Sequence, residues 1–433
     1  MNDYLKNPCP CGKMHTVAID QVVVGGGVVK RLPEFVTRYG QRPFVIADVN
    51  TWQAAGEPVR AALADIPYSC YIFPQKALEP DERAVGAAFM HLDKSCDVIV
   101  GVGSGVINDI CKIVSNVTGK PYIIVATAPS MDGYASATSS MSMDGVKVSL
   151  NSRCADVIVG DTDILKTAPD HMLKAGLGDM LAKFVSIAEW RIANLITGEY
   201  YCEEVAQLIR SALQKCVDNA QGLLRREEKA VEAVFEGLVI GGVAMAYAGV
   251  SRPASGVEHY FSHVWDMRGL EFGTQVDLHG IQCALGTHLA VKLYEQVKKI
   301  TPDREKAANY VQDFSYEDWA QELRAFLGSA ADTMIALEAK EGKYRKDHHE
   351  ARLEIILNNW QKILDILEQE LPSLSQLEEI LDAVGLSWDT ACIGVDRETA
   401  RQTFRATKDI RDKYVLSRLA WDLGILEALC KLI

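Results

Sequence analysis

The alternation of short apolar runs with helical stretches over roughly the first 165 residues most constrains the fold of this chain. Runs rich in β-branched residues recur there, and stretches of helical periodicity separate most of them. This alternation indicates βαβ units and a parallel sheet covered on both faces. We predict strands at residues 22–24, 44–47, 71–73, 97–102, 122–126 and 157–159, and helices at 28–39, 58–64, 81–94 and 106–118.

The pattern changes after Pro169, where strand signals nearly vanish and long amphipathic stretches follow, such as 203–224, 229–248 and 351–370. We therefore predict an α/β nucleotide-binding domain with a parallel sheet (1–168), followed by an all-helical domain (169–433). Within residues 139–150, Asp144-Gly145 lies between alternating residues and predicts a β-hairpin. We expect the charge-rich segment 338–350 to be solvated, with His348 and His349 exposed.

Charge and hydropathy exclude several classes of protein. The 433 residues include 45 Lys and Arg against 58 Asp and Glu, a net charge of −13, whereas nucleic acids and anionic membranes require a basic face. We therefore expect no nucleic-acid or membrane partner. No uninterrupted apolar run approaches the ~18 residues of a membrane span, and the first residues carry no hydrophobic signal core, so a cytoplasmic location is expected.

The eleven cysteines are scattered through the chain and indicate reduced, mostly buried thiols. Cys9-Pro-Cys11 with His15 nearby could begin a zinc site. No second cysteine pair follows at zinc-finger spacing, however, so the sequence favours a simple turn.

A glycine-containing junction follows the fourth predicted strand, where Gly103-Ser104-Gly105 leads into a helix. Backbone amides at such a junction can approach a pyrophosphate, and the helix N-terminus adds partial positive charge. A tight turn would also require these glycines. The earlier Gly25-Gly26-Gly27 fails the dinucleotide fingerprint, because Lys30 stands where its last glycine is needed.

Two further strand ends carry polar residues. Asp48 follows a strand and could bind a ribose hydroxyl, which would favour NAD over NADP, or could cap the next helix. The segment from Thr127 to Ser136 (TAPSMDGYAS) places hydroxyls, a carboxylate and a glycine directly after an apolar strand. Ligands of α/β proteins bind at such strand ends, although a hydroxyl-rich turn can also be purely structural.

Four residues in apolar helical stretches are candidate metal ligands. Asp179 lies within GLGDMLAK, His259 and His263 are four residues apart on one helix face, and His279 opens another apolar helix. Buried imidazoles and carboxylates need partners. Two imidazoles and a carboxylate with an open coordination position suit a divalent Lewis acid such as zinc, nickel or iron.

At these residues the sequence resembles the sn-glycerol-1-phosphate dehydrogenase family, which shares a superfamily with glycerol dehydrogenase, iron-dependent alcohol dehydrogenase and dehydroquinate synthase. The similarity extends from about Val22 to the end of the chain, although Val102 replaces a glycine found in many relatives. The motifs that carry it are GVGSGVINDICK (101–112), ATAPSMDGYAS (126–136), AGLGDMLAK (175–183), SRPASGVEHYFSH (251–263), LHG (278–280) and IRDKYVLSRLAWDLG (410–424).

The resemblance implies a dehydroquinate-synthase-like fold and a set of site residues. Asp179, His259 and His279 match the metal ligands of the family, and Asp179 also faces the substrate. His263 and Asp132 match substrate-contacting positions. The matched cofactor contacts are Asp48, Gly103, Ser104, Gly105, Val106, Ile107, Asn108, Asp109, Thr127, Ser130 and Ser136.

The implied reaction is reversible hydride transfer between NAD(H), or NADP(H), and C2 of dihydroxyacetone phosphate, assisted by one divalent metal ion. Lys183 and Arg252 are candidates for binding the substrate phosphate. The alternatives are another polyol dehydrogenase on the same scaffold, or a catalytically dead nucleotide-binding protein. Dehydroquinate synthase is disfavoured, because that branch has glutamate where this chain has Asp179. A homo-oligomer is expected.

Overall fold

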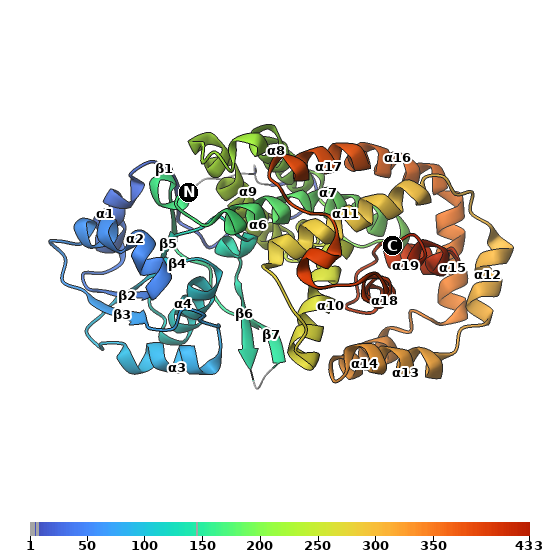
Figure 1. Cartoon of the computed structure of the whole chain (residues 1–433), viewed down its shortest axis with the longest axis horizontal. Coiled ribbons are helices and arrows are strands. Elements are labelled where there is room, and N and C mark those ends of the chain that lie inside the picture. Colours follow the sequence, from blue (N-terminus) through green and yellow to red (C-terminus); the bar gives the residue numbers. More distant parts are fainter. Residues whose placement is uncertain (1–4, 6–7, 144–145) are drawn as a thin grey trace. The chain divides into compact units, whose positions relative to one another are not determined.

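A six-stranded parallel sheet organises the N-terminal part of the chain in this computed structural model, which describes residues 5, 8–143 and 146–433 (Figure 1). The strand order is β1-β8-β5-β4-β2-β3, and every neighbouring pair is parallel. All six predicted strands are confirmed: β1 Gln21–Gly25, β2 Pro43–Asp48, β3 Ser69–Phe73, β4 Val98–Gly103, β5 Tyr122–Ala126 and β8 Val157–Asp161.

The strands in the middle of the sheet are buried along their whole length, which explains why their sequences read as unbroken apolar runs. Helical elements connect them: η1 Val28–Arg31, α1 Leu32–Tyr39, α2 Val49–Ala62, α3 Glu82–His91 and α4 Gly105–Thr118. The helix predicted at 58–64 instead begins at Val49, so Pro58 lies inside α2 rather than at its start.

The chain divides into two compact units. Unit 1 comprises Met1–Met180 and Glu204–Val250, and unit 2 comprises Leu181–Glu203 and Ser251–Ile433. Unit 1 extends past residue 168 because helices that follow the last strand group with the sheet. These helices are α5 Thr162–Leu165, most of α6 Asp170–Leu181, nearly all of α8 Glu203–Asn219, and α9 Glu228–Ala248.

Unit 1 also contains the predicted hairpin. Strands β6 (Thr138–Met143) and β7 (Val146–Asn151) pair antiparallel, while Asp144 and Gly145 lie outside the described residues. A short helix, η2 (Asp132–Ala135), precedes β6.

Helix α9 is long and apolar enough to span a membrane by length and composition, but 72% of its most apolar window is buried within the structure, as in the core helix of a folded protein. Glu232 and Glu236 interrupt the apolar run of this segment, so the sequence alone does not indicate a membrane span there.

Unit 2, all of whose residues are described, contains helices and no strands. Besides η4 Thr390–Ile393, these are α7 Lys183–Thr197, α10 Val257–Phe272, α11 His279–Val297, α12 Arg304–Gln312, α13 Tyr316–Leu327, α14 Ala330–Glu341, α15 Lys346–Asn358, α16 Trp360–Glu370, α17 Leu374–Ala383, α18 Arg397–Thr407, α19 Leu416–Asp422 and α20 Leu426–Cys430.

The core of unit 2 includes buried charges. The Asp409 carboxylate accepts hydrogen bonds from Lys408, Trp319 and Tyr344, and Lys343 lies 3.3 Å away. Burial would raise the pKa of Asp409, but the two ammonium groups outweigh burial and lower it to about 2.

The expectation that His349 is exposed was wrong. His348 is exposed, but His349 is buried, with Nε2 2.9 Å from the Asp422 carbonyl oxygen.

Candidate functional site

The Gly103–Gly105 junction places the N-terminus of α4 directly after the central strand β4. A Cβ at Gly103 would lie 2.5 Å from the Ile107 Cβ, so only glycine fits there. Ser104 is the N-cap residue of α4, and its side chain does not cap the helix. The first-turn amides of α4 are therefore not satisfied by this side chain and can receive an anion.

Two buried side chains of α4 hold the neighbouring polar loop. Asn108 Nδ2 donates to the Gly133 carbonyl oxygen (3.1 Å), and Asn108 Oδ1 accepts from Tyr122 (2.9 Å). Lys112, which the sequence analysis did not assign to the site, donates to the carbonyl oxygens of Gly133 (2.6 Å) and Thr138 (3.0 Å). In the structure, Asn108 therefore positions the polar loop that contains Gly133.

The other predicted cofactor residues of α4 differ in how much of each side chain is exposed. Ile107 is buried, whereas Val106 and Asp109 are partly exposed. Asp109 Oδ1 lies 3.4 Å from Lys112 Nζ.

The polar loop of residues 127–136 follows β5 and is fixed to the glycine junction, since Thr127 N–H donates to the Gly103 carbonyl oxygen (3.1 Å). Ser130 is buried, and Ser136 Oγ lies 2.8 Å from Thr138 Oγ1. The backbone N–H of Asp132 donates to Asp179 Oδ2 (3.0 Å). The structure therefore brings two of the predicted catalytic residues together within unit 1.

Two glycines let helices approach this loop closely. A Cβ at Gly176 of α6 would lie 1.8 Å from the Pro129 carbonyl oxygen, and a Cβ at Gly242 of α9 would lie 2.9 Å from the Asp132 carbonyl oxygen. Neither role is evident from the sequence, although Gly176 belongs to the AGLGDMLAK motif.

Asp48 caps α2. Its Oδ1 accepts from the N–H groups of Asn50 (2.8 Å) and Thr51 (3.0 Å), and Thr51 Oγ1 accepts from the Asp48 N–H (3.0 Å), which completes a capping box. Of the two interpretations of Asp48, helix capping is observed. Both capping bonds use the same carboxylate oxygen.

Within unit 2, two of the predicted ligands lie close together. The His259 and His279 rings, from α10 and the first residue of α11, are 5.0 Å apart between centroids. Ligand atoms of His259, His279 and Cys283 all lie within 4.8 Å of one another. Cys283 follows His279 by four residues on one helix face, a spacing that could have identified it from the sequence.

Each of the two imidazole rings is oriented by a hydrogen bond at its Nδ1 atom. His259 Nδ1 lies 2.9 Å from Glu258 Oε1, and His279 Nδ1 lies 3.0 Å from Ser262 Oγ. Metal-binding histidines characteristically use one ring nitrogen in this way and bind the ion with the other. Burial would raise the pKa of Cys283, but His259 and His279 outweigh burial and lower it.

Two buried glutamates support the start of α10. Glu258 Oε1 accepts from the Gly256 N–H (2.6 Å), and Glu189 Oε2 accepts from the Val257 N–H (2.8 Å). Burial and the Glu258 carboxylate raise the pKa of Glu189 to about 8. These contacts fix the helix turn that carries His259.

The remaining predicted residues of unit 2 differ in their surroundings. His263 is partly exposed, and its ring lies 6.1 Å from that of His279. Arg252 is buried and donates to Glu199 Oε1 (2.7 Å) and the Tyr414 carbonyl oxygen (3.0 Å). Lys183 is buried, with Nζ 3.3 Å from the Ala254 carbonyl oxygen.

Comparison with known proteins gives the family. Residues 23–169 match the family model described as iron-containing alcohol dehydrogenase. A glycerol-1-phosphate dehydrogenase [NAD(P)+] of Halalkalibacterium halodurans is 34% identical over 316 residues, covering 69% of this chain and 79% of that protein. One of Hyperthermus butylicus is 33% identical over 286 residues, covering 65% and 80%.

The chain belongs to the glycerol-1-phosphate dehydrogenase family. Solved structures confirm the predicted fold class. A probable glycerol dehydrogenase from Sinorhizobium meliloti superposes with a TM-score of 0.60 at 18% identity, covering 96% of this chain and 98% of that one. An iron-containing alcohol dehydrogenase from Thermococcus thioreducens gives 0.62 at 12% identity, covering 96% and 99%.

Proposed function

We propose that this protein is a metal-dependent sn-glycerol-1-phosphate dehydrogenase that transfers a hydride reversibly between NAD(P)H and C2 of dihydroxyacetone phosphate. The observation that carries the proposal is the similarity, at 31–34% identity, to bacterial and archaeal proteins that all bear this name. The glycine junction and the histidine cluster supply the two binding functions that such a reaction needs.

The cofactor is assigned to the carboxyl edge of the sheet. The α4 N-terminus and Gly103–Gly105 would hold its pyrophosphate, because uncapped amides and the helix dipole favour an anion. Thr127, Ser130 and Ser136 would contact the remainder of the cofactor from the polar loop. Asp48 would accept a ribose hydroxyl through Oδ2, since Oδ1 caps α2. When bound, NAD(P)H supplies the hydride.

The proposed metal ligands are Asp179, His259 and His279, one carboxylate and two imidazoles. The donor set fits a divalent ion of the zinc, nickel or iron type, because hydrogen bonds at Nδ1 orient both rings and Nε2 is the other ligand atom of each. When bound, the metal supplies Lewis-acid stabilisation of negative charge on the substrate oxygen.

Other residues of the chain would position a metal ligand, transfer the proton and bind the substrate phosphate. Asp132 positions Asp179 through its backbone N–H. His263 holds the proton that is delivered to the C2 oxygen on reduction and removed on oxidation, directly or through water. Lys183 and Arg252 stay the two candidates for binding the substrate phosphate, and both already have partners: Arg252 donates to Glu199 and the Tyr414 carbonyl oxygen, and Lys183 to the Ala254 carbonyl oxygen.

The test compares NADH oxidation with dihydroxyacetone phosphate and with dihydroxyacetone, in metal-stripped and metal-reloaded enzyme. We expect activity only after reloading and a much higher kcat/KM for the phosphate. A higher kcat/KM for dihydroxyacetone would instead indicate a polyol dehydrogenase. NADH binding without oxidation by either substrate would indicate a nucleotide-binding protein that has lost its chemistry.

The partner of the enzyme would be this small-molecule substrate. Homo-oligomeric assembly, cytoplasmic location and the absence of nucleic-acid or membrane partners stay predictions.

A further inference from the structure

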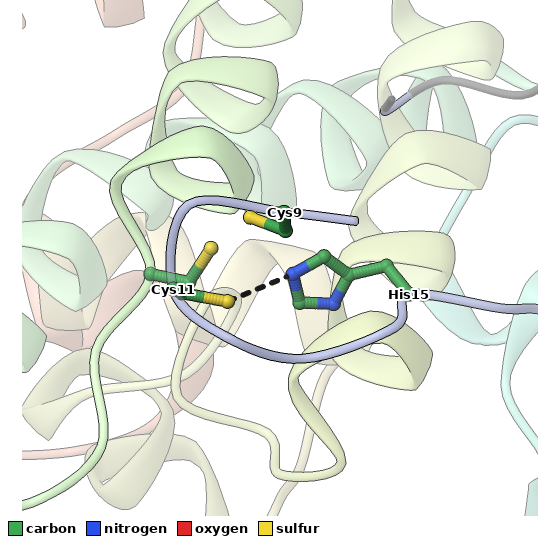
Figure 2. Close-up of side chains that lie close together, drawn as sticks. Cys9, Cys11 and His15 are labelled. Atoms are coloured by element: carbon green, nitrogen blue, oxygen red, sulfur yellow. Dashed lines mark hydrogen bonds between the residues drawn. The ribbon is translucent and has the colours of Figure 1, made fainter. Parts of the chain in front are cut away.

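The N-terminal loop of residues 9–15 gathers three metal-binding side chains outside the site described above. Cys9, Cys11 and His15 each offer a ligand atom to a group whose members all lie within 4.8 Å of one another. Figure 2 shows these side chains directed toward one another across the loop, with Cys11 Sγ 3.3 Å from His15 Nε2. Cys9 and His15 are buried, at 4% and 3% exposed.

The backbone of the loop is built to hold this arrangement. The Gly12 N–H donates to the Cys9 carbonyl oxygen (2.9 Å), and the Cys9 N–H donates to the Lys13 carbonyl oxygen (3.3 Å), so the chain folds back between the two cysteines and the histidine. Gly12 has φ of +83°, a conformation that other residues rarely adopt. The CPCG sequence therefore forms a turn, as expected, and the two thiol sulfur atoms lie within 4.8 Å of each other.

The imidazole of His15 is oriented for coordination. Its Nδ1 lies 3.0 Å from the carbonyl oxygen of Tyr247 at the end of α9, within the same unit. A backbone carbonyl accepts only from a protonated nitrogen, so Nδ1 carries the proton and Nε2 has the lone pair that a metal requires. Nε2 is the atom that lies beside the Cys11 thiol.

We propose that Cys9, Cys11 and His15 bind a structural zinc ion, separate from the catalytic metal. Thiolate and imidazole donors select zinc, and two such ligands on a tetrahedral ion lie about 3.5–3.8 Å apart. The Cys11–His15 distance of 3.3 Å approaches this value without an ion.

A structural zinc site is closed by a fourth ligand. Cys9, Cys11 and His15 supply three of the four, and one further cysteine or histidine would complete a Cys₃His or Cys₂His₂ set.

The proposed ion would fasten the N-terminal loop to the end of α9 through His15. An ion held by four protein ligands has no open coordination position, so the site would stabilise the fold and take no part in hydride transfer.

The first experiment measures zinc per subunit by elemental analysis in the full-length protein, prepared without chelators. We expect one zinc in addition to the catalytic metal. The double variant Cys9→Ser/Cys11→Ser loses this one equivalent, whereas Cys70→Ser/Cys392→Ser, which removes two exposed thiols, retains it. His259→Ala/His279→Ala loses only the catalytic metal.

A second measurement keeps Cys9 and Cys11 in place, in case the Cys9→Ser/Cys11→Ser variant fails to fold. Cobalt(II) exchanged into the site should give the intense charge-transfer absorption of thiolate ligands, and this absorption should persist in His259→Ala/His279→Ala. Two results would overturn the proposal: complete loss of metal from the histidine double variant, or a disulfide that consumes Cys9 or Cys11 in the protein as purified, detected by mass spectrometry.

Discussion

Replacing Gly176 with alanine tests whether close packing of α6 against the polar loop positions the proposed active site. The added Cβ would lie 1.8 Å from the Pro129 carbonyl oxygen and 3.0 Å from Val234 Cγ1. Such atoms are essentially never closer than 3.0 Å, so helix and loop must separate by at least about 1.2 Å. The displaced elements carry Asp179 and Asp132, which are joined by a 3.0 Å hydrogen bond.

We expect Gly176→Ala to lower the free energy of unfolding by about 1–3 kcal/mol, the usual cost of overpacking. A displacement of about 1 Å at a reacting centre can reduce the rate roughly 100-fold, so kcat should fall by that order. Urea unfolding and NADH oxidation with dihydroxyacetone phosphate measure the two effects.

The matched control is Gly86→Ala in α3, where an added Cβ meets no atom within 4 Å. This variant should gain about 0.5–1 kcal/mol, because alanine restricts the unfolded chain and favours a helix, and its activity should be unchanged. If Gly176→Ala were as stable and as active as the parent, the close approach would not position the site.

Three other predictions concern single side chains. Asp48→Ala should lower the free energy of unfolding by about 0.5–2 kcal/mol, because the α2 cap is lost, and should also reduce the preference for NADH over NADPH. The control variant Asp81→Ala removes the α3 cap and should lower stability without changing the cofactor preference. The Asp179→Asn variant should lose the catalytic metal, whereas His263→Ala should keep the metal and turn over slowly. Stoichiometric metal in Asp179→Asn, measured by elemental analysis, would show that Asp179 is not a ligand. The lowered pKa of Asp409 means that its stabilising contribution is complete above the unfolded-state pKa near 3.8 and is lost as the pH falls toward 2. Between pH 5 and 2.5 the loss of stability measured by thermal unfolding should therefore be smaller in Asp409→Asn than in the parent, by about 2 kcal/mol.

The strands of the sheet could be predicted from the sequence because parallel strands buried on both faces must be apolar along their length. Residues 122–126 were predicted as a strand and form β5 with these bounds. The start of α2 could not be predicted for two reasons. Proline is common in the first turn of a helix, so Pro58 suggested a start at that residue. An aspartate at a strand end can also bind a ribose or cap the next helix, and the sequence does not distinguish these roles for Asp48.

Parts of the site depended on contacts distant in sequence. The hydrogen bond between Asp132 and Asp179 joins residues 47 positions apart, and the Lys112 contact with the polar loop spans 21. Hydrophobic periodicity carries no information about such pairs. Cys283 was within reach of the sequence, since a cysteine four residues after a candidate ligand lies on the same helix face.

The configuration of the product tests the proposed function most directly. Dihydroxyacetone phosphate is reduced with NADH by the metal-loaded enzyme, and the glycerol phosphate formed is assayed with a dehydrogenase specific for the sn-3 enantiomer. We predict that the product is sn-glycerol 1-phosphate and is not oxidised in this assay. Complete oxidation of the product would show that the hydride reaches the opposite face of C2 and would contradict the assignment.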